Sequence, residues 1–122
     1  MIFAFAWIGN ADAHKVKVRT GIENLERENF KILKGKRVGL ITNPTGVDRN
    51  LRSTIDILHS AANVRLVALY GPEHGVRGDE YAGGSVADSK DPSTGLPVYS
   101  LYGKTRKATP EMLANIDVLV YD

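Results

Sequence analysis

Apolar and polar positions follow one another in blocks that predict alternating helices and strands. Residues 20–23 form a capping box, in which a Thr and a Glu three positions later satisfy the first amides of a helix. The positions that then recur at helical spacing, until Gly35 stops the segment, are Ile22, Leu25, Asn29 and Leu33. Residues 37–43 follow as a mostly apolar run, which Asn43-Pro44 ends because this dipeptide continues neither a ladder nor a helix. The pattern predicts a helix over 21–34 and a strand buried on both faces.

The same alternation returns further along the chain. Ser53 and Asp56 form a second capping box, and the helix that they begin is predicted to end near Asn63. Residues 64–69 predict a second strand, and residues 116–122 predict a last strand, which we expect to be buried. Repetition of this strand, helix and strand unit predicts right-handed parallel crossovers, and so an α/β fold with a parallel sheet covered by helices.

A long and weakly patterned segment separates the second strand from the last one. Thr109-Pro110-Glu111 predicts the start of a short helix before the last strand, and residues 96–103 are strand-like. A loop of this length inside a compact domain is usually functional or disordered. The aromatic strand inside it argues against disorder.

Composition and charge exclude several classes of function. The chain has 122 residues, with 16 Lys and Arg against 14 Asp and Glu, and this balance is no electrostatic footprint for nucleic acid. The absence of Cys excludes disulfides and thiolate metal sites, and the three His lack ligand spacing. Gly71, Gly75 and Gly78 match neither a P-loop nor a dinucleotide fingerprint. We therefore expect no nucleic acid, metal or organic cofactor.

Both ends of the chain differ from its middle. Residues 2–8 are continuously apolar, and Ala11-Asp12-Ala13 resembles a cleavage site before His14. The run is too short to span a bilayer, so residues 1–13 predict the remnant of a secretory signal peptide and an exported protein. No Lys or Arg precedes the run, so either the chain begins after the true start, as we favour, or the segment is a buried strand. Because the last strand stops at its carboxyl end, we also expect the chain to be a fragment.

Charged and polar side chains follow the predicted strands where each of them ends. In open parallel sheets, ligands bind outside the carboxyl ends of the strands. The loop over residues 70–79 is the most unusual segment, because it holds two carboxylates, an imidazole and a guanidinium among three glycines and a proline. Topology predicts that one edge of the sheet gathers Asn43, Thr45, Asp48, Glu73, His74, Arg77 and Asp122.

These residues differ in how strongly they indicate a site. Asp48 is interpreted as a turn former or helix cap, whereas Glu73 and His74 are not needed to make a turn. Arg77 could clamp a carboxylate or phosphate, or could form a structural ion pair with Asp79 or Glu80. Of the remaining candidates, we interpret His59 as structural and the basic segment 104–107, beside Tyr99 and Tyr102, as a solvated loop rather than a site for an anionic or sugar ligand.

Several motifs together resemble one family. From Gly21 onward, the sequence is similar to the amino-terminal part of the NamZ-type exo-β-N-acetylmuramidases, glycoside hydrolase family 171. The motifs that carry the resemblance, in order, are residues 35–43, 44–48, 52–56, 72–78 and 91–102. The resemblance implies an exported bacterial enzyme that removes N-acetylmuramic acid from the non-reducing end of peptidoglycan fragments. It also implies a Rossmann-like amino-terminal domain, of which residues 14–122 would be an incomplete part, and a smaller carboxyl-terminal domain, with the active site between the two.

The resemblance also implies roles for individual residues. It gives Glu73 the role of general acid, with a pKa raised by burial in the cleft, while His74 orients it or binds a sugar hydroxyl. Arg77 would bind the lactyl carboxylate of muramic acid. From their place at the strand ends, Asn43, Thr45 and Asp122 are also predicted to bind the substrate. Asp122 is a candidate for the second carboxylate that glycoside hydrolysis usually needs. The alternative is a non-catalytic module that binds an anionic sugar or phosphate through Arg77 and the basic segment.

Overall fold

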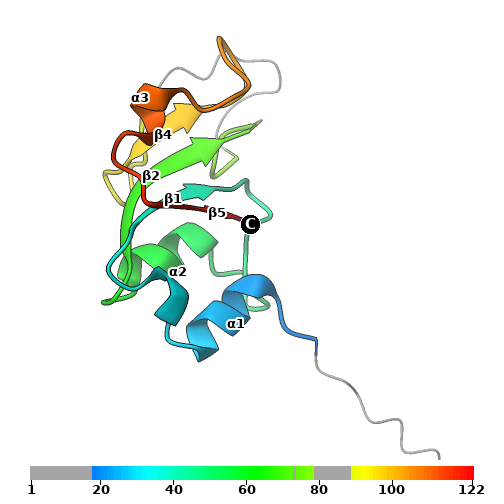
Figure 1. Ribbon diagram of the computed structural model, residues 1–122. Coiled ribbons are helices and arrows are strands. Elements are labelled where there is room, and N and C mark those ends of the chain that lie inside the picture. Colours follow the sequence, from blue (N-terminus) through cyan, green and yellow to red (C-terminus); the bar gives the residue numbers. More distant parts are fainter. Residues whose placement is uncertain (1–17, 73, 79–88) are drawn as a thin grey trace, which may run out of the picture.

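A computed structural model describes residues 18–72, 74–78 and 89–122 of the chain, and its sheet and helices are drawn in Figure 1. The described residues form a five-stranded sheet of order β3-β4-β2-β1-β5. The strands are β1 Arg37–Ile41, β2 Arg65–Gly71, β3 Ser89–Lys90, β4 Pro97–Ser100 and β5 Val118–Tyr121. The helices are α1 Gly21–Arg27, α2 Thr54–Ser60 and α3 Pro110–Leu113, with a short 3-10 helix at Lys31–Leu33.

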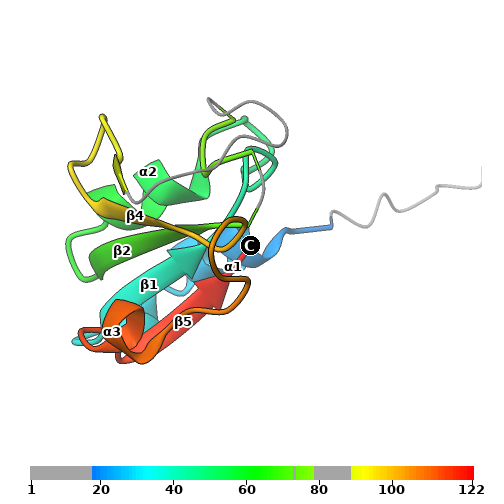
Figure 2. The same cartoon turned by 90° about the horizontal axis from the view of Figure 1, so that it is seen from above.

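The sheet is parallel except at one edge. β1 pairs in parallel with β2 and β5, β2 pairs in parallel with β4, and only β3 runs antiparallel to its neighbour β4. Helices α1 and α2 lie on one side of the sheet and α3 lies on the other, as Figures 1 and 2 show. The α/β class, the parallel sheet and the flanking helices are confirmed. The β3 strand was not predicted.

The core lies between the sheet and the α1–α2 layer. Val38 and Leu40 of β1 are fully buried and pack with apolar residues of both helices. On the other face, Tyr70 is fully buried and its hydroxyl donates to the Met112 carbonyl oxygen of α3 at 2.7 Å. Gly39 allows this packing, because a Cβ there would lie 2.9 Å from the Tyr70 ring. Both faces of β1 are therefore covered, as predicted.

The first helix is shorter than predicted. The capping box is present, since Thr20 Oγ1 accepts from the Glu23 amide and the Thr20 amide donates to Glu23 Oε2 at 2.8 Å. The helix ends at Arg27, however, because Asn29 and Phe30 both adopt a left-handed φ of 51°. This turn accompanies burial of Phe30 in the core, and Leu33 then enters the core from the 3-10 helix. The prediction of one helix over 21–34 was wrong.

The last strand is also not buried as predicted. Among the described residues β5 pairs with β1 alone and lies at the edge of the sheet. Val118 and Val120 pack against the core, whereas Leu119 is 41% exposed and Tyr121 is 81% exposed. An apolar run alone does not distinguish an edge strand from a central one.

No helix within the described ranges has the length and apolar character needed to cross a membrane. The predicted signal-peptide remnant, residues 1–13, lies outside these ranges.

Candidate functional site at the carboxyl edge of the sheet

An open cleft of about 550 Å³ lies where β1, β2 and β5 end. The residues that line it are Asn43, Pro44, Thr45, Pro72, His74 and Tyr121. Asn43, Thr45 and His74 were predicted to gather at this edge, and the cleft confirms that they do. Glu73, the predicted acid, lies outside the described residues, although its chain neighbours Pro72 and His74 both line the cleft.

The loop after β1 is shaped by one side chain. Asn43 Oδ1 accepts from the Thr45 amide at 2.9 Å and from Thr45 Oγ1 at 2.7 Å, which is the hydrogen bonding of an Asx turn. Among the described residues, no hydrogen bond is made by the side-chain nitrogen of Asn43. The Asn43 oxygen therefore holds the loop, and its NH2 group can donate to a ligand in the cleft.

The loop after β2 is held in an unusual conformation. His74 is exposed and has a left-handed φ of 62°, which costs a non-glycine residue about 1–2 kcal/mol. Gly78 also has a positive φ, and a Cβ there would lie 2.9 Å from Pro44 Cγ. The two loops therefore pack directly against each other, and any side chain at position 78 would push them apart. A strained residue beside a cleft is a feature that functional sites often show.

Arg77 is engaged by two carboxylates of the protein itself. Its Nε lies 2.5 Å from Asp91 Oδ1, and its Nη2 lies 2.7 Å from Asp56 Oδ1. The hydrogen bonds to Asp91 and then those to Asp56 raise the pKa of Arg77 above its ordinary value. The structural ion pair that the sequence left open is thus present, with Asp91 and Asp56 as its acids. Pairing with Asp79 or Glu80 stays a prediction, because both lie outside the described residues. The second capping box is accordingly only half formed, since Ser53 caps α2 while Asp56 contacts Arg77.

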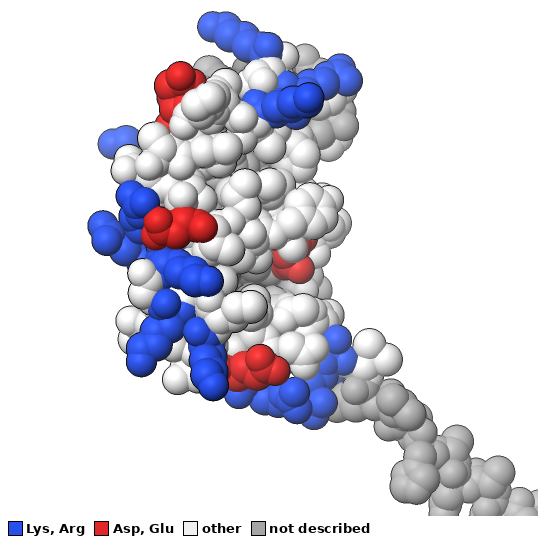
Figure 3. All heavy atoms as spheres, viewed as in Figure 1, with Lys and Arg blue, Asp and Glu red and all other residues white. Residues whose placement is uncertain are grey.

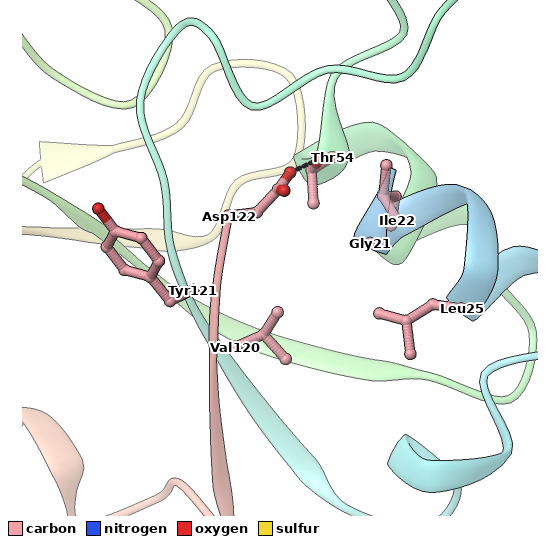
Figure 4. Close-up of a pocket in the computed structure, with 7 residues that line it drawn as sticks. All are labelled: Gly21, Ile22, Leu25, Thr54, Val120, Tyr121 and Asp122. Atoms are coloured by element: carbon pink, nitrogen blue, oxygen red, sulfur yellow. Dashed lines mark hydrogen bonds between the residues drawn. The ribbon is translucent and has the colours of Figure 1, made fainter. Parts of the chain in front are cut away.

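Asp122 and Tyr121 leave β5 on opposite sides, as Figure 4 shows. The Thr54 hydroxyl donates to the Asp122 carboxylate, and Asp122 lines a separate pocket of about 170 Å³ between β5 and α1. Tyr121 borders that pocket too, but it also lines the main cleft, which Asp122 does not. The structure therefore does not bring Asp122 to the cleft with His74. Sequence reasoning missed Tyr121, although the alternation of side chains along a strand could have revealed it.

The other candidates lie away from the cleft. Asp48 is 3% exposed and accepts from the amides of Asn50 and Arg52, each at 2.8 Å, so its structural interpretation is confirmed. His59 is exposed near the end of α2. In the segment 104–107, Arg106 lies 5.5 Å from the centre of the Tyr102 ring. Basic side chains gather at the top of Figure 3, over the loop between β4 and α3.

Within the described ranges, no three His, Asp or Glu side chains form a group that could hold a metal ion.

Comparison with known proteins assigns the chain to a family. Residues 38–122 match the family model described as "Exo-beta-N-acetylmuramidase NamZ, N-terminal". The chain belongs to this family. It is 58% identical over 113 residues to "Peptidoglycan beta-N-acetylmuramidase NamZ" of Bacillus subtilis (strain 168). That alignment covers 93% of this chain and 27% of the relative.

Two solved structures support the fold. A DUF1343 family protein from Bacteroides fragilis NCTC 9343 is 73% identical, with a TM-score of 0.78 over 85% of this chain. A second DUF1343 family protein from the same organism is 33% identical, with a TM-score of 0.66 over 87% of this chain. The matched part is 25% of each solved chain. The chain thus spans about a quarter of the length of the relatives that it matches.

Proposed function

We propose that this chain is part of a glycoside hydrolase that releases N-acetylmuramic acid from the non-reducing end of peptidoglycan fragments. The observation that carries the proposal is the 58% identity to a protein named as a peptidoglycan β-N-acetylmuramidase. The cleft adds physical support, because it combines an amide donor, an imidazole and an aromatic ring at the edge where parallel sheets bind ligands. These groups suit the hydroxyl groups and ring faces of a sugar. We expect no metal or organic cofactor.

Glu73 is the proposed general acid. It stands between Pro72 and His74, two residues that line the cleft. A carboxylic acid that protonates a glycosidic oxygen must stay protonated near neutral pH, which burial beside bound substrate promotes. His74 would orient this acid or bind a sugar hydroxyl, and Asn43 would donate to the substrate. Thr45 contributes by holding the Asn43 side chain in place.

The catalytic role of Glu73 can be tested in the complete gene product with a chromogenic β-N-acetylmuramide. We expect Glu73→Gln to lower kcat by roughly 10²- to 10⁴-fold, the usual contribution of a general acid, while substrate binding is kept. Glu28→Gln is the matched control, because the Glu28 side chain is exposed and, among the described residues, contacts only Arg27, at 3.9 Å. Undiminished turnover in Glu73→Gln would remove Glu73 from the mechanism.

The alternative of a non-catalytic module is less well supported. That hypothesis uses Arg77 as the main contact for an anionic ligand, but Asp56 and Asp91 already occupy the guanidinium. A module of this kind would bind the muramide without releasing its chromophore. The turnover assay on the wild-type protein therefore separates the two functions.

Export is the remaining part of the proposal. The apolar run over residues 2–8 and the Ala-x-Ala sequence before His14 support it. Amino-terminal sequencing of the protein recovered from the periplasm or medium would test it. We expect the mature protein to begin at His14, whereas a cytoplasmic protein with an intact start would contradict export.

A further inference from the structure

The Arg77 side chain joins three segments that are distant in the sequence. Its Nε and Nη2 donate to Asp91 at 2.5 and 3.0 Å, and Asp91 directly follows β3. Its Nη2 and Nη1 donate to Asp56 of α2 at 2.7 and 3.3 Å. Both contacts are two-pronged, which is the geometry that a guanidinium provides and an ammonium does not. We call Asp56, Arg77 and Asp91 the Arg77 clamp.

The two acids of the clamp differ in burial. The Asp91 side chain is 1% exposed and the Arg77 side chain is 22% exposed, whereas Asp56 is 53% exposed. Asp91 Oδ2 also accepts from the amide and hydroxyl of Thr94, at 2.9 and 2.6 Å. A turn closes around it, because the Asp91 amide donates to the Leu96 carbonyl at 2.9 Å. Asp91 is thus a fixed, buried anion, and it requires a cation to compensate its charge.

The clamp fixes one end of the strained loop. Gly71 fixes the other end, because its carbonyl accepts from the Leu101 amide at 2.8 Å beside β4. Between these two points the chain buries Val76 in the core and holds His74 at a left-handed φ of 62°. Glu73 lies in the same interval of the sequence. Such a backbone conformation persists only where the surrounding structure enforces it.

We propose that Arg77 is a positioning residue, which holds the Gly71–Gly78 loop in the conformation that keeps His74, the chain neighbour of the proposed acid Glu73, at the cleft. This proposal rests on the proposed hydrolase function. The proposal replaces direct binding of a substrate carboxylate by Arg77. Such a carboxylate would have to displace the carboxylate of Asp91, which Thr94 holds in place. The carboxylates of Asp56 and Asp91 account for four N–H···O contacts of the guanidinium.

Kinetics of the complete gene product with a chromogenic muramide test the role. We expect Arg77→Lys and Asp91→Asn each to lower kcat by at least about tenfold while KM stays within about twofold. The substrate-binding groups of the cleft remain in both variants, whereas the loop that carries the proposed general acid Glu73 is no longer held. The double variant should be no worse than the poorer single variant, since both act through one clamp. Asp56→Asn should lose less than about threefold, because this partner in the clamp is exposed. Glu28→Gln, outside the clamp, is the matched control and should keep wild-type kinetics. A rise in KM with unchanged kcat for Arg77→Lys alone would instead place Arg77 on the substrate and overturn the proposal.

Amide hydrogen exchange provides a readout that does not depend on turnover. In Arg77→Lys, the amides of residues 74–78 should exchange at least about tenfold faster, while those of residues 38–41 keep their wild-type rates and show that the protein is folded. Unchanged exchange at 74–78 would overturn the clamp. Arg77→Lys retains a cation beside Asp91, so it remains informative if Asp91→Asn does not fold. Absence of turnover in the wild type would overturn the proposed hydrolase function and the kinetic part of this proposal. The exchange measurement would still show whether the clamp holds the loop, so the two failures can be told apart.

Discussion

Two arginines bind carboxylates at opposite ends of the sheet, and their surroundings differ. At the amino end of β1, Arg37 contacts Asp117 through Nη2 at 2.7 Å and Nε at 3.1 Å, with side chains that are 37% and 39% exposed. At the carboxyl edge, Arg77 makes the same kind of contact with Asp91, which is 1% exposed. The chemistry of the two pairs is alike, but only the second removes a carboxylate from water.

The difference shows why the two pairs have different consequences. Arg37 and Asp117 join β1 and β5, which the parallel ladder already holds together. Arg77 instead joins a loop, a helix and a turn that share no ladder. An exposed pair adds little to an arrangement that exists without it, whereas a buried pair that loses one partner leaves an uncompensated charge. Of the two pairs, the one at the carboxyl edge is therefore the one in which a single charge change should matter more.

The largest expected effect is that of breaking the buried pair by mutating its cation. We expect Arg77→Met to lower the free energy of unfolding of the complete gene product by about 3–5 kcal/mol, because Asp91 remains buried without its cation. Denaturant unfolding measures the loss. Replacing both partners, as Arg77→Met with Asp91→Leu, should recover part of it. A loss no greater than that of Asp117→Asn would remove the contrast between the two pairs.

A smaller effect should distinguish the two sides of β5. Tyr121→Ala should raise KM for the muramide by roughly tenfold, equivalent to about 1.4 kcal/mol of binding, because its ring lines the cleft. Asp122→Asn is the neighbouring control, and it should leave KM unchanged, because Asp122 contacts Thr54 outside the cleft. The opposite result would restore Asp122 as the substrate-binding residue that the sequence suggested.

The smallest effect belongs to the exposed pair, and it depends on pH. The side-chain hydrogen bond from Arg37 is the main cause that lowers the pKa of Asp117 to about 2. Because this pKa is lower in the folded protein than the ordinary value near 4, the pair stabilises the fold above about pH 4 and loses that effect as the pH falls towards 2. We expect Asp117→Asn to lower the unfolding temperature only slightly at pH 7 and to match the wild type at pH 2, where Asp117 is losing its charge. A clear destabilisation at pH 7 would show that exposure does not weaken the pair.

Local sequence signals predicted much of the fold and part of the site. The helix starts at Thr20, Ser53 and Thr109 were visible because each cap is made within four residues. The first helix was predicted too long because burial of Phe30, a tertiary effect, ends it in a left-handed turn. The partners of Arg77 were missed because they lie 14 and 21 residues away, and only the folded sheet brings them together. The gathering of Asn43, Thr45 and His74 was predictable because it follows from strand direction alone.

A crystal structure of the complete gene product with bound N-acetylmuramic acid tests the central claim most directly. We predict that the sugar occupies the cleft at the carboxyl edge, within hydrogen-bond distance of Asn43 and His74 and against the Tyr121 ring, with Arg77 still bound to Asp91. A sugar bound on the basic segment 104–107, or with its lactyl carboxylate on Arg77, would contradict this account of the site.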